Sequence, residues 1–108
     1  MKRGDLFRVY QISKNDPKKQ RVYLVVSRQG IIDNIFTTVI CAPVYSKYYG
    51  LPTQVEVGVE EGLKHDSAVY CDALASINKS ALTDFVGNLT NSKMKEVNTA
   101  IRIALAVG

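Results

Sequence analysis

Short apolar segments rich in β-branched residues recur along the chain, and one segment near the carboxyl end has helical spacing instead. Valine, isoleucine and threonine (13, 8 and 6 residues) account for 27 of the 108 residues. These residues favour strands, because branching at Cβ restricts the side-chain rotamers available in a helix. A chain of this length suits one domain of ordinary size and is too short for two. We therefore expect a single domain, residues 1–108, built mainly from β-sheet.

The order of the apolar segments predicts the architecture. Strands are expected at 5–12, 22–26, 36–44, 54–59, 67–74 and 85–89. The segment 54–59 alternates strictly, with its three valines facing the core, whereas the continuous apolar run 22–26 predicts a strand covered on both faces. No helix separates consecutive strands, so the sheet should be mostly antiparallel. The sequence predicts a mainly β (α+β) fold, a small twisted antiparallel barrel closed by a carboxyl-terminal helix.

The predicted helix spans 92–107. Its apolar residues follow helical spacing and form one stripe: Met94, Val97, Ile101 and Leu105. Charged side chains lie off this stripe, as expected for a helix with one face against a core. Asn91 or Ser92 is the expected N-cap residue.

The basic side chains are concentrated in the first third of the chain. Residues 1–30 contain eight of the 14 basic groups and two of the 10 acidic groups, which leaves a local charge of +6 and a remainder of −2. Clustered lysine and arginine attract phosphates or carboxylates. This asymmetry favours a polyanionic partner, either nucleic acid or an acidic protein segment. A solvated basic surface without a partner is the plainer interpretation.

Several classes of protein are disfavoured by the sequence. Cys41 and Cys71 lie in apolar runs without metal-binding spacing, so we expect buried, reduced thiols. The single histidine, His65, cannot complete a zinc site, and no metal or cofactor is expected. No apolar stretch follows the first basic residues, and no apolar run is long enough to span a membrane. We expect a cytoplasmic protein without membrane contact.

Seven short motifs extend over nearly the whole chain. They are RGDLF at 3–7, RVYLVV at 21–26, TVICAP at 38–43, LPTQV at 51–55, GLKHDS at 62–67, CDALASIN at 71–78 and VGNL at 86–89. Their order and gaps resemble those of the MazF/PemK toxins of type II toxin–antitoxin systems. The resemblance implies an SH3-like barrel, usually a homodimer, that cleaves single-stranded mRNA at short sequences without a metal. It also implies an acidic antitoxin protein as partner.

The resemblance implies catalytic roles for four side chains. RNA cleavage by the 2′-hydroxyl requires a base, a cation at the phosphate and an acid for the leaving oxygen. Arg21 matches the family's phosphate-holding arginine, and Asp72 matches a carboxylate that serves as acid or base in the PemK branch. Tyr45 and Ser46 stand near the position of a MazF threonine, and either hydroxyl would assist. We expect Arg21 and Asp72 to converge beneath one groove.

Other interpretations of these residues stay open. Without the resemblance, the favoured explanations are a structural ion pair for Arg21 and a hydrogen-bonding carboxylate at a strand end for Asp72. His65, which matches no functional position of the family, is expected to be a surface loop residue.

Two loops combine basic and aromatic residues in a way typical of single-stranded RNA binding. The expected RNA-binding residues are Lys14, Lys18, Lys19, Lys47, Tyr48 and Tyr49. Each base stacked on a tyrosine contributes about 1–3 kcal/mol. The alternative is that Tyr48 and Tyr49 pack over the barrel mouth or a dimer interface.

A second hypothesis follows from three departures from the family pattern. Tyr45 replaces the threonine, and Ala73 and Ala75 stand where the family has glutamine and arginine. The chain would then be a catalytically weakened barrel that binds an acidic antitoxin peptide, or a protein target such as DNA gyrase, as the related CcdB toxins do. A generic SH3-like peptide module is disfavoured, because the chain has no tryptophan for an aromatic groove.

Overall fold

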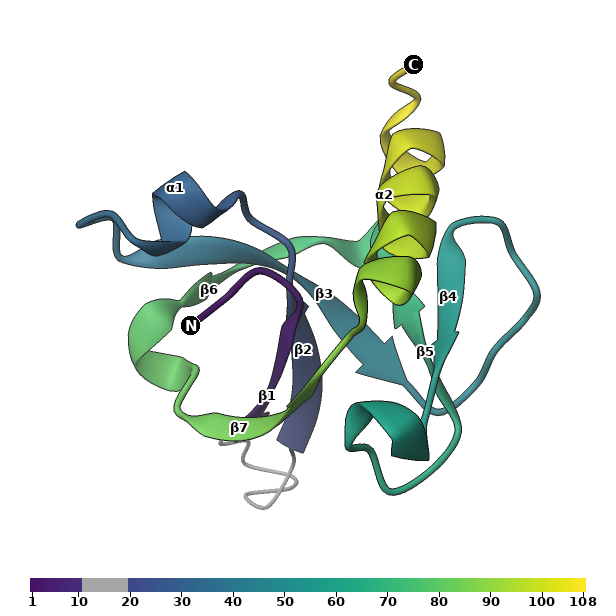
Figure 1. The fold of residues 1–108 in the computed structure, drawn as a ribbon, viewed down its shortest axis with the longest axis horizontal. Helices are drawn as coiled ribbons and strands as arrows, with labels where there is room; N and C mark the ends of the chain where they lie inside the picture. Colours follow the sequence, from purple (N-terminus) through teal and green to yellow (C-terminus); the bar gives the residue numbers. More distant parts are fainter. Residues whose placement is uncertain (11–19) are drawn as a thin grey trace, which may run out of the picture.

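The computed structural model describes residues 1–10 and 20–108 (Figure 1). Its strands are β1 (Asp5–Tyr10), β2 (Gln20–Val25), β3 (Thr38–Tyr45), β4 (Gln54–Val57), β5 (Ser67–Tyr70), β6 (Ala75–Asn78) and β7 (Asp84–Asn88). The helices are α1 (Gln29–Ile32) and α2 (Asn91–Leu105), and three short 3-10 turns are η1 (Val59–Glu61), η2 (Cys71–Ala73) and η3 (Lys79–Ala81).

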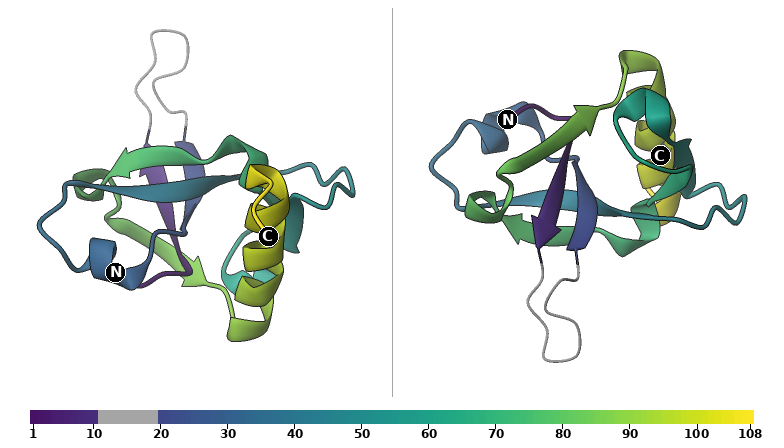
Figure 2. Two further views of the ribbon diagram at one scale, coloured as in Figure 1. Left: turned by 90° about the horizontal axis from the view of Figure 1, so that it is seen from above. Right: turned by 90° about the horizontal axis from the view of Figure 1, so that it is seen from below.

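The strands form one curled antiparallel sheet. Its order is β4-β5-β3-β2-β1-β7, and β6 pairs with the first half of β3. Figure 2 shows the sheet wrapped into a partial barrel with α2 beside it. The antiparallel barrel-like sheet with a carboxyl-terminal helix, predicted from the sequence, is confirmed.

Strand β2 is covered on both faces, as its continuous apolar run predicts. Leu24 belongs to one core cluster with Leu6 and Val97, which lies under α2. Val25, the next residue, belongs to a second cluster with Val39. Successive side chains of a strand point to opposite faces, so a strand between two cores must be apolar throughout.

The predicted strand 67–74 is interrupted, and this moves Asp72 out of the strand. Val44 of β3 pairs with Val69 of β5, and Cys41 of β3 pairs with Ala75 of β6. The step from Val69 to Ala75 is six residues, whereas the matching step along β3 is three. The surplus forms η2, which separates β5 from β6. Asp72 therefore lies in an exposed turn and not within an apolar strand.

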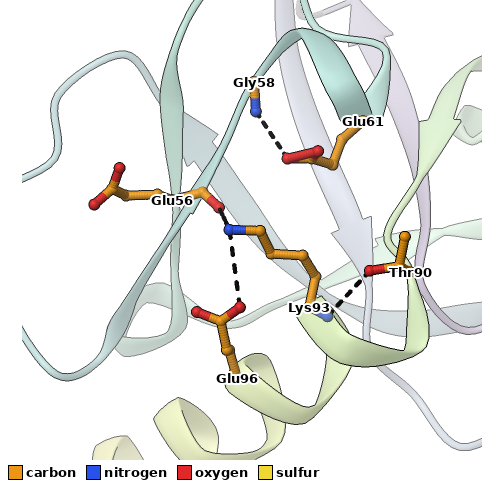
Figure 3. Close-up of polar contacts among 6 residues, drawn as sticks. All are labelled: Glu56, Gly58, Glu61, Thr90, Lys93 and Glu96. Carbon is orange, nitrogen blue, oxygen red and sulfur yellow. Dashed lines mark hydrogen bonds and ion pairs between the residues drawn. The ribbon is translucent and has the colours of Figure 1, made fainter.

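Strand β4 ends before Val59, which the alternation placed in the core. The Gly58 N–H donates to Glu61 Oε1 at 3.0 Å, and the Glu61 N–H donates to the Gly58 carbonyl at 3.0 Å. These bonds turn the chain into η1 (Figure 3). Val59 is consequently 72% exposed. The expectation of an inward-facing Val59 is wrong, because a local turn ends the strand two residues early.

Helix α2 begins at Asn91, one residue before the predicted start at residue 92. Thr90 is the N-cap, and its Oγ1 accepts a hydrogen bond from the Lys93 N–H at 3.2 Å (Figure 3). Lys93 Nζ also donates to the Glu56 carbonyl at 2.8 Å and thereby links α2 to β4. The helix buries Met94 and Val97 as predicted, whereas Leu105 in its last turn is exposed.

The two cysteines are free and buried, as expected. Cys41 and Cys71 are 0% and 1% exposed. Burial raises the pKa of the Cys41 thiol to about 12 and, with help from the neighbouring Asp72, that of the Cys71 thiol to about 11. Buried thiols with raised pKa values are poor nucleophiles, so neither cysteine is a candidate for catalysis. Within the described residues, no helix is long and apolar enough to cross a membrane.

Two glycines allow η1 to pack against β7. A Cβ at Gly87 would overlap the Glu61 carbonyl oxygen, and a Cβ at Gly62 would overlap the Val86 carbonyl oxygen. Gly62 also has a φ of 101°, which L side chains rarely adopt. This contact joins regions near the two edges of the sheet, because β4 and β7 end the strand order.

Replacing Gly87 by alanine should destabilise the protein by about 3 kcal/mol, because the new methyl group meets backbone that cannot rotate away. Chemical denaturation followed by circular dichroism measures this change. Gly50→Ala is a useful comparison, since that glycine has open space around it and only its positive φ of 74° opposes the substitution. Equal stability of Gly87→Ala and the wild-type protein would contradict the packing described.

Candidate functional site

Arg21 and Tyr45 lie side by side at adjacent strand ends. Val22 pairs with Val44, so Arg21 at the start of β2 faces Tyr45 at the end of β3. The Arg21 Cζ atom lies 4.2 Å from the centroid of the Tyr45 ring, a cation–π contact. Within residues 1–10 and 20–108, no carboxylate forms an ion pair with Arg21. Stacking on a ring leaves the N–H groups at the edge of the guanidinium available to a phosphate.

Tyr70 extends this pair into a row of three side chains on one face of the sheet. The rings of Tyr45 and Tyr70 have centroids 4.6 Å apart, with an angle of 52° between their planes. Burial, with nearby Tyr49 and Tyr45, raises the pKa of Tyr70. Its hydroxyl therefore stays protonated and donates to the Lys47 carbonyl at 2.5 Å.

Strands β4 and β5 hold the loop 46–53 at two points. One is the bond from the Tyr70 hydroxyl to the Lys47 carbonyl. The other is formed by Gln54, whose Oε1 accepts a hydrogen bond from the Tyr49 N–H at 2.9 Å. The sheet thus fixes where this loop lies relative to Arg21.

Tyr70→Phe should raise the KM for RNA about 3- to 10-fold with little change in kcat, because one hydrogen bond of roughly 1 kcal/mol to the loop is lost while the ring is kept. Steady-state cleavage kinetics separate the two constants. Tyr10→Phe is the matched control, since that hydroxyl donates to Asp84 instead of the loop. A KM for Tyr70→Phe no higher than that of the control would refute the role of the hydroxyl.

Asp72 is held by a buried hydroxyl. Thr53 is 8% exposed, and its Oγ1 donates to Asp72 Oδ2 at 2.5 Å. The Thr53 carbonyl accepts a bond from the Cys71 N–H at 3.0 Å, which anchors the start of η2. Among the described residues, the other carboxylate oxygen of Asp72 has no hydrogen-bond partner. The Asp72 residue is exposed, so this oxygen is not engaged by the rest of the described chain.

Arg21 and Asp72 are not joined directly. No ion pair connects them within the part of the chain that the structure describes. Arg21 stacks on Tyr45, and Tyr45 packs on Tyr70, which precedes Asp72 by two residues in the chain. That both groups act on one RNA linkage stays a prediction.

The loop after β3 presents its polar and aromatic side chains to solvent. Ser46 and Lys47 are exposed, and Tyr48 and Tyr49 are 46% and 64% exposed. Lys47 Nζ lies 5.9 Å from the centroid of the Tyr49 ring. Neither Tyr48 nor Tyr49 is buried in the core of this chain, so both rings are accessible to a stacking base. Three further expected RNA-binding residues lie outside the described residues: Lys14, Lys18 and Lys19.

The structure also brings forward residues that the sequence alone did not single out. Thr53, Gln54 and Tyr70 position the site through the bonds above. His65 is exposed in a loop, as expected, but it lines a cavity with Tyr45. The signal available for Tyr70 was its place two residues before Asp72, which sets both on the same side of a regular strand.

The model for PemK-like, MazF-like toxins of type II toxin–antitoxin systems matches residues 2–105. The chain belongs to this family. Endoribonuclease EndoA of Bacillus subtilis (strain 168) is 30% identical over 111 residues, which cover 99% of this chain and 96% of EndoA. These matches confirm the resemblance drawn from the seven motifs.

Solved structures of MazF-like toxins share the fold of this one. The Mycobacterium tuberculosis toxin MazF-mt6 has a TM-score of 0.81 at 27% identity, with 98% of this chain and 99% of that chain covered. A mycobacterial endoribonuclease in complex with its cognate antitoxin has a TM-score of 0.85 at 23% identity, with coverage of 100% and 97%.

The motifs of this MazF-like toxin meet in the fold. Thr53 of the LPTQV motif bonds Asp72 of the CDALASIN motif. Gly62 of the GLKHDS motif lies against Gly87 of the VGNL motif. The first of these motif pairs positions Asp72 in the candidate site. The second forms a packing contact between η1 and β7.

Proposed function

We propose that this MazF-like toxin is a sequence-selective endoribonuclease that cleaves single-stranded mRNA without a metal. It acts in the cytoplasm as a homodimer and is inhibited by an acidic antitoxin. The observation that carries the proposal is the stacked Arg21 guanidinium, which has no carboxylate partner among the described residues and lies next to an exposed basic and aromatic loop. The name of EndoA, which is 30% identical over 99% of this chain, supports the same activity.

The chemistry assigned to the site is attack of the ribose 2′-hydroxyl on the adjacent phosphorus. The new P–O bond forms as the bond to the 5′-oxygen breaks, which leaves a cyclic phosphate and a 5′-hydroxyl. Arg21 donates hydrogen bonds to the nonbridging oxygens as negative charge accumulates there. Asp72 takes the 2′-hydroxyl proton, and the hydroxyl of Tyr45 or Ser46 supplies a proton to the leaving oxygen.

RNA contacts outside the reacting linkage are assigned to the two basic loops. Tyr48 and Tyr49 would stack on bases, and Lys47 would contact the backbone, as their exposure permits. The second group of contacts is proposed for Lys14, Lys18 and Lys19. Such contacts select RNA whose bases are unpaired and able to stack on side chains.

The test is incubation of the purified toxin with a long single-stranded RNA in excess EDTA. The expected products are discrete fragments with 2′,3′-cyclic phosphate and 5′-hydroxyl ends. Intact RNA at micromolar protein concentration would refute the enzymatic proposal.

A binding function is the second candidate, favoured by the alanines around Asp72. Ala73 and Ala75 are exposed and offer no polar group to RNA. Under this alternative, growth inhibition on expression would survive Asp72→Asn, and a pull-down would return a protein target such as DNA gyrase. Loss of toxicity together with loss of cleavage would exclude it.

A further inference from the structure

A small basic cavity adjoins the candidate active site. Its volume is about 180 Å³, and it opens where β2 begins and β3 ends. Figure 1 shows the end of β3 on the same side of the molecule as β4 and β5. The polar side chains that line the cavity include Arg8, Tyr45, Ser46, Lys64, His65 and Ser67. None of the described lining residues is acidic.

The lining suits a phosphate group. Arginine, lysine and histidine side chains donate N–H bonds to anionic oxygens, and the Ser46 hydroxyl can donate an O–H bond. The Ser67 hydroxyl already donates to the His65 carbonyl at 3.0 Å and thereby anchors the loop that carries His65. The cavity volume of about 180 Å³ is large enough to admit a phosphate group. A nucleic acid backbone is bound in general through such contacts from basic and hydroxyl side chains.

Arg8 retains donors for such a ligand. Its Nη1 lies 3.5 Å from Asp84 Oδ2, a long ion pair, and the Tyr10 hydroxyl donates to that same oxygen at 2.8 Å. A guanidinium has five N–H donors, so this single contact leaves most of them unused.

A neighbouring cavity has the opposite charge. It has a volume of about 410 Å³, shares Ser46 and Ser67 with the basic cavity, and its charged lining residues are Glu56, Glu60, Glu61, Asp66 and Lys93. Lys93 Nζ lies 3.8 Å from Glu96 and is bonded to the Glu56 carbonyl (Figure 3). Four carboxylates against one engaged ammonium repel phosphate. An RNA strand passing Ser46 is therefore directed to the basic side.

We propose that the basic cavity formed by Arg8, Lys64 and His65 is a second phosphate subsite, which binds another linkage of the RNA strand that is cleaved. The inference rests on the proposed endoribonuclease function. Tyr45 and Ser46 belong both to the proposed catalytic group and to the wall of this cavity. Arg8 pairs with Val22, the residue after Arg21, so the cavity and the Arg21 guanidinium lie on different faces of β2. An RNA strand bound at Arg21 therefore reaches the cavity by passing Ser46 at the end of β3.

The test compares Lys64→Ala/His65→Ala with the wild-type toxin. The probe is a fluorescently labelled 2′-O-methyl single-stranded RNA, which lacks the attacking hydroxyl and stays intact. Anisotropy titrations in EDTA at several salt concentrations give the slope of log K against log salt. Loss of one phosphate contact should make that slope shallower by about 0.7 and weaken binding about 5-fold near 0.1 M salt. Lys95→Ala, an exposed lysine of α2, is the matched control.

Charge-preserving replacement sharpens the result. Lys64→Arg should keep the wild-type slope, and with cleavable RNA the double alanine variant should raise KM while kcat stays within about 2-fold. A slope for the double variant equal to that of wild type and Lys95→Ala would overturn the subsite. Failure of the wild-type toxin to cleave RNA would instead refute the proposed function. The salt slopes, measured with RNA that cannot be cleaved, would still decide separately whether the cavity binds a phosphate.

Discussion

Replacing Arg21 by alanine should lower the rate constant for RNA cleavage about 100- to 1,000-fold. The guanidinium is stacked on Tyr45 at 4.2 Å and is already oriented before substrate arrives. A preorganised donor to the developing negative charge contributes about 3–4 kcal/mol to transition-state stabilisation. Alanine removes both the charge and the donors while leaving β2 in place.

The measurement is single-turnover cleavage at saturating protein in EDTA, which reports the chemical step. Arg21→Lys should recover part of the rate, because an ammonium keeps the charge but lacks the planar pair of donors. Arg102→Ala is the control, since this exposed arginine lies on α2. Cleavage by Arg21→Ala within a few-fold of the control would remove Arg21 from the mechanism.

Asp72→Asn should lower the cleavage rate at least about 100-fold, the lower end of what a positioned acid or base contributes. The amide has the same shape and can still accept the hydrogen bond from Thr53, so the turn η2 should persist. What the variant loses is the carboxylate oxygen that, in the proposed mechanism, takes the 2′-hydroxyl proton.

Single-turnover cleavage rates, measured together with the thermal unfolding of each protein, separate an effect on chemistry from an effect on stability. Asp33→Asn is the matched control, because this exposed carboxylate lies at the end of α1. A variant at Asp72 that cleaves RNA normally would show that another group moves the proton. A variant that no longer cleaves RNA but still arrests growth would favour the binding function.

The linear pattern of the chain determined the framework of the fold. The β-branched composition and the short connections predict an antiparallel sheet, and the continuous apolar run around Leu24 predicts a strand with a core on each face. Both features follow from the alternation of side chains along a strand, and this alternation can be seen in the sequence of one strand alone. The motif order was likewise sufficient to identify the family, since it depends only on residue identities and gaps.

Tertiary pairing alone decided the geometry of the candidate site. Six residues of the chain lie against three of β3, and this surplus expels Asp72 into an exposed turn where Thr53 can bond it. Nothing within 67–74 reveals the register of its partner strand. The contact of Tyr70 with the loop 46–53 depends in the same way on how distant segments fold together, and so does the cavity that His65 and Tyr45 both line. Side-chain type limits what a residue can do, and the register of the sheet decides which residues meet.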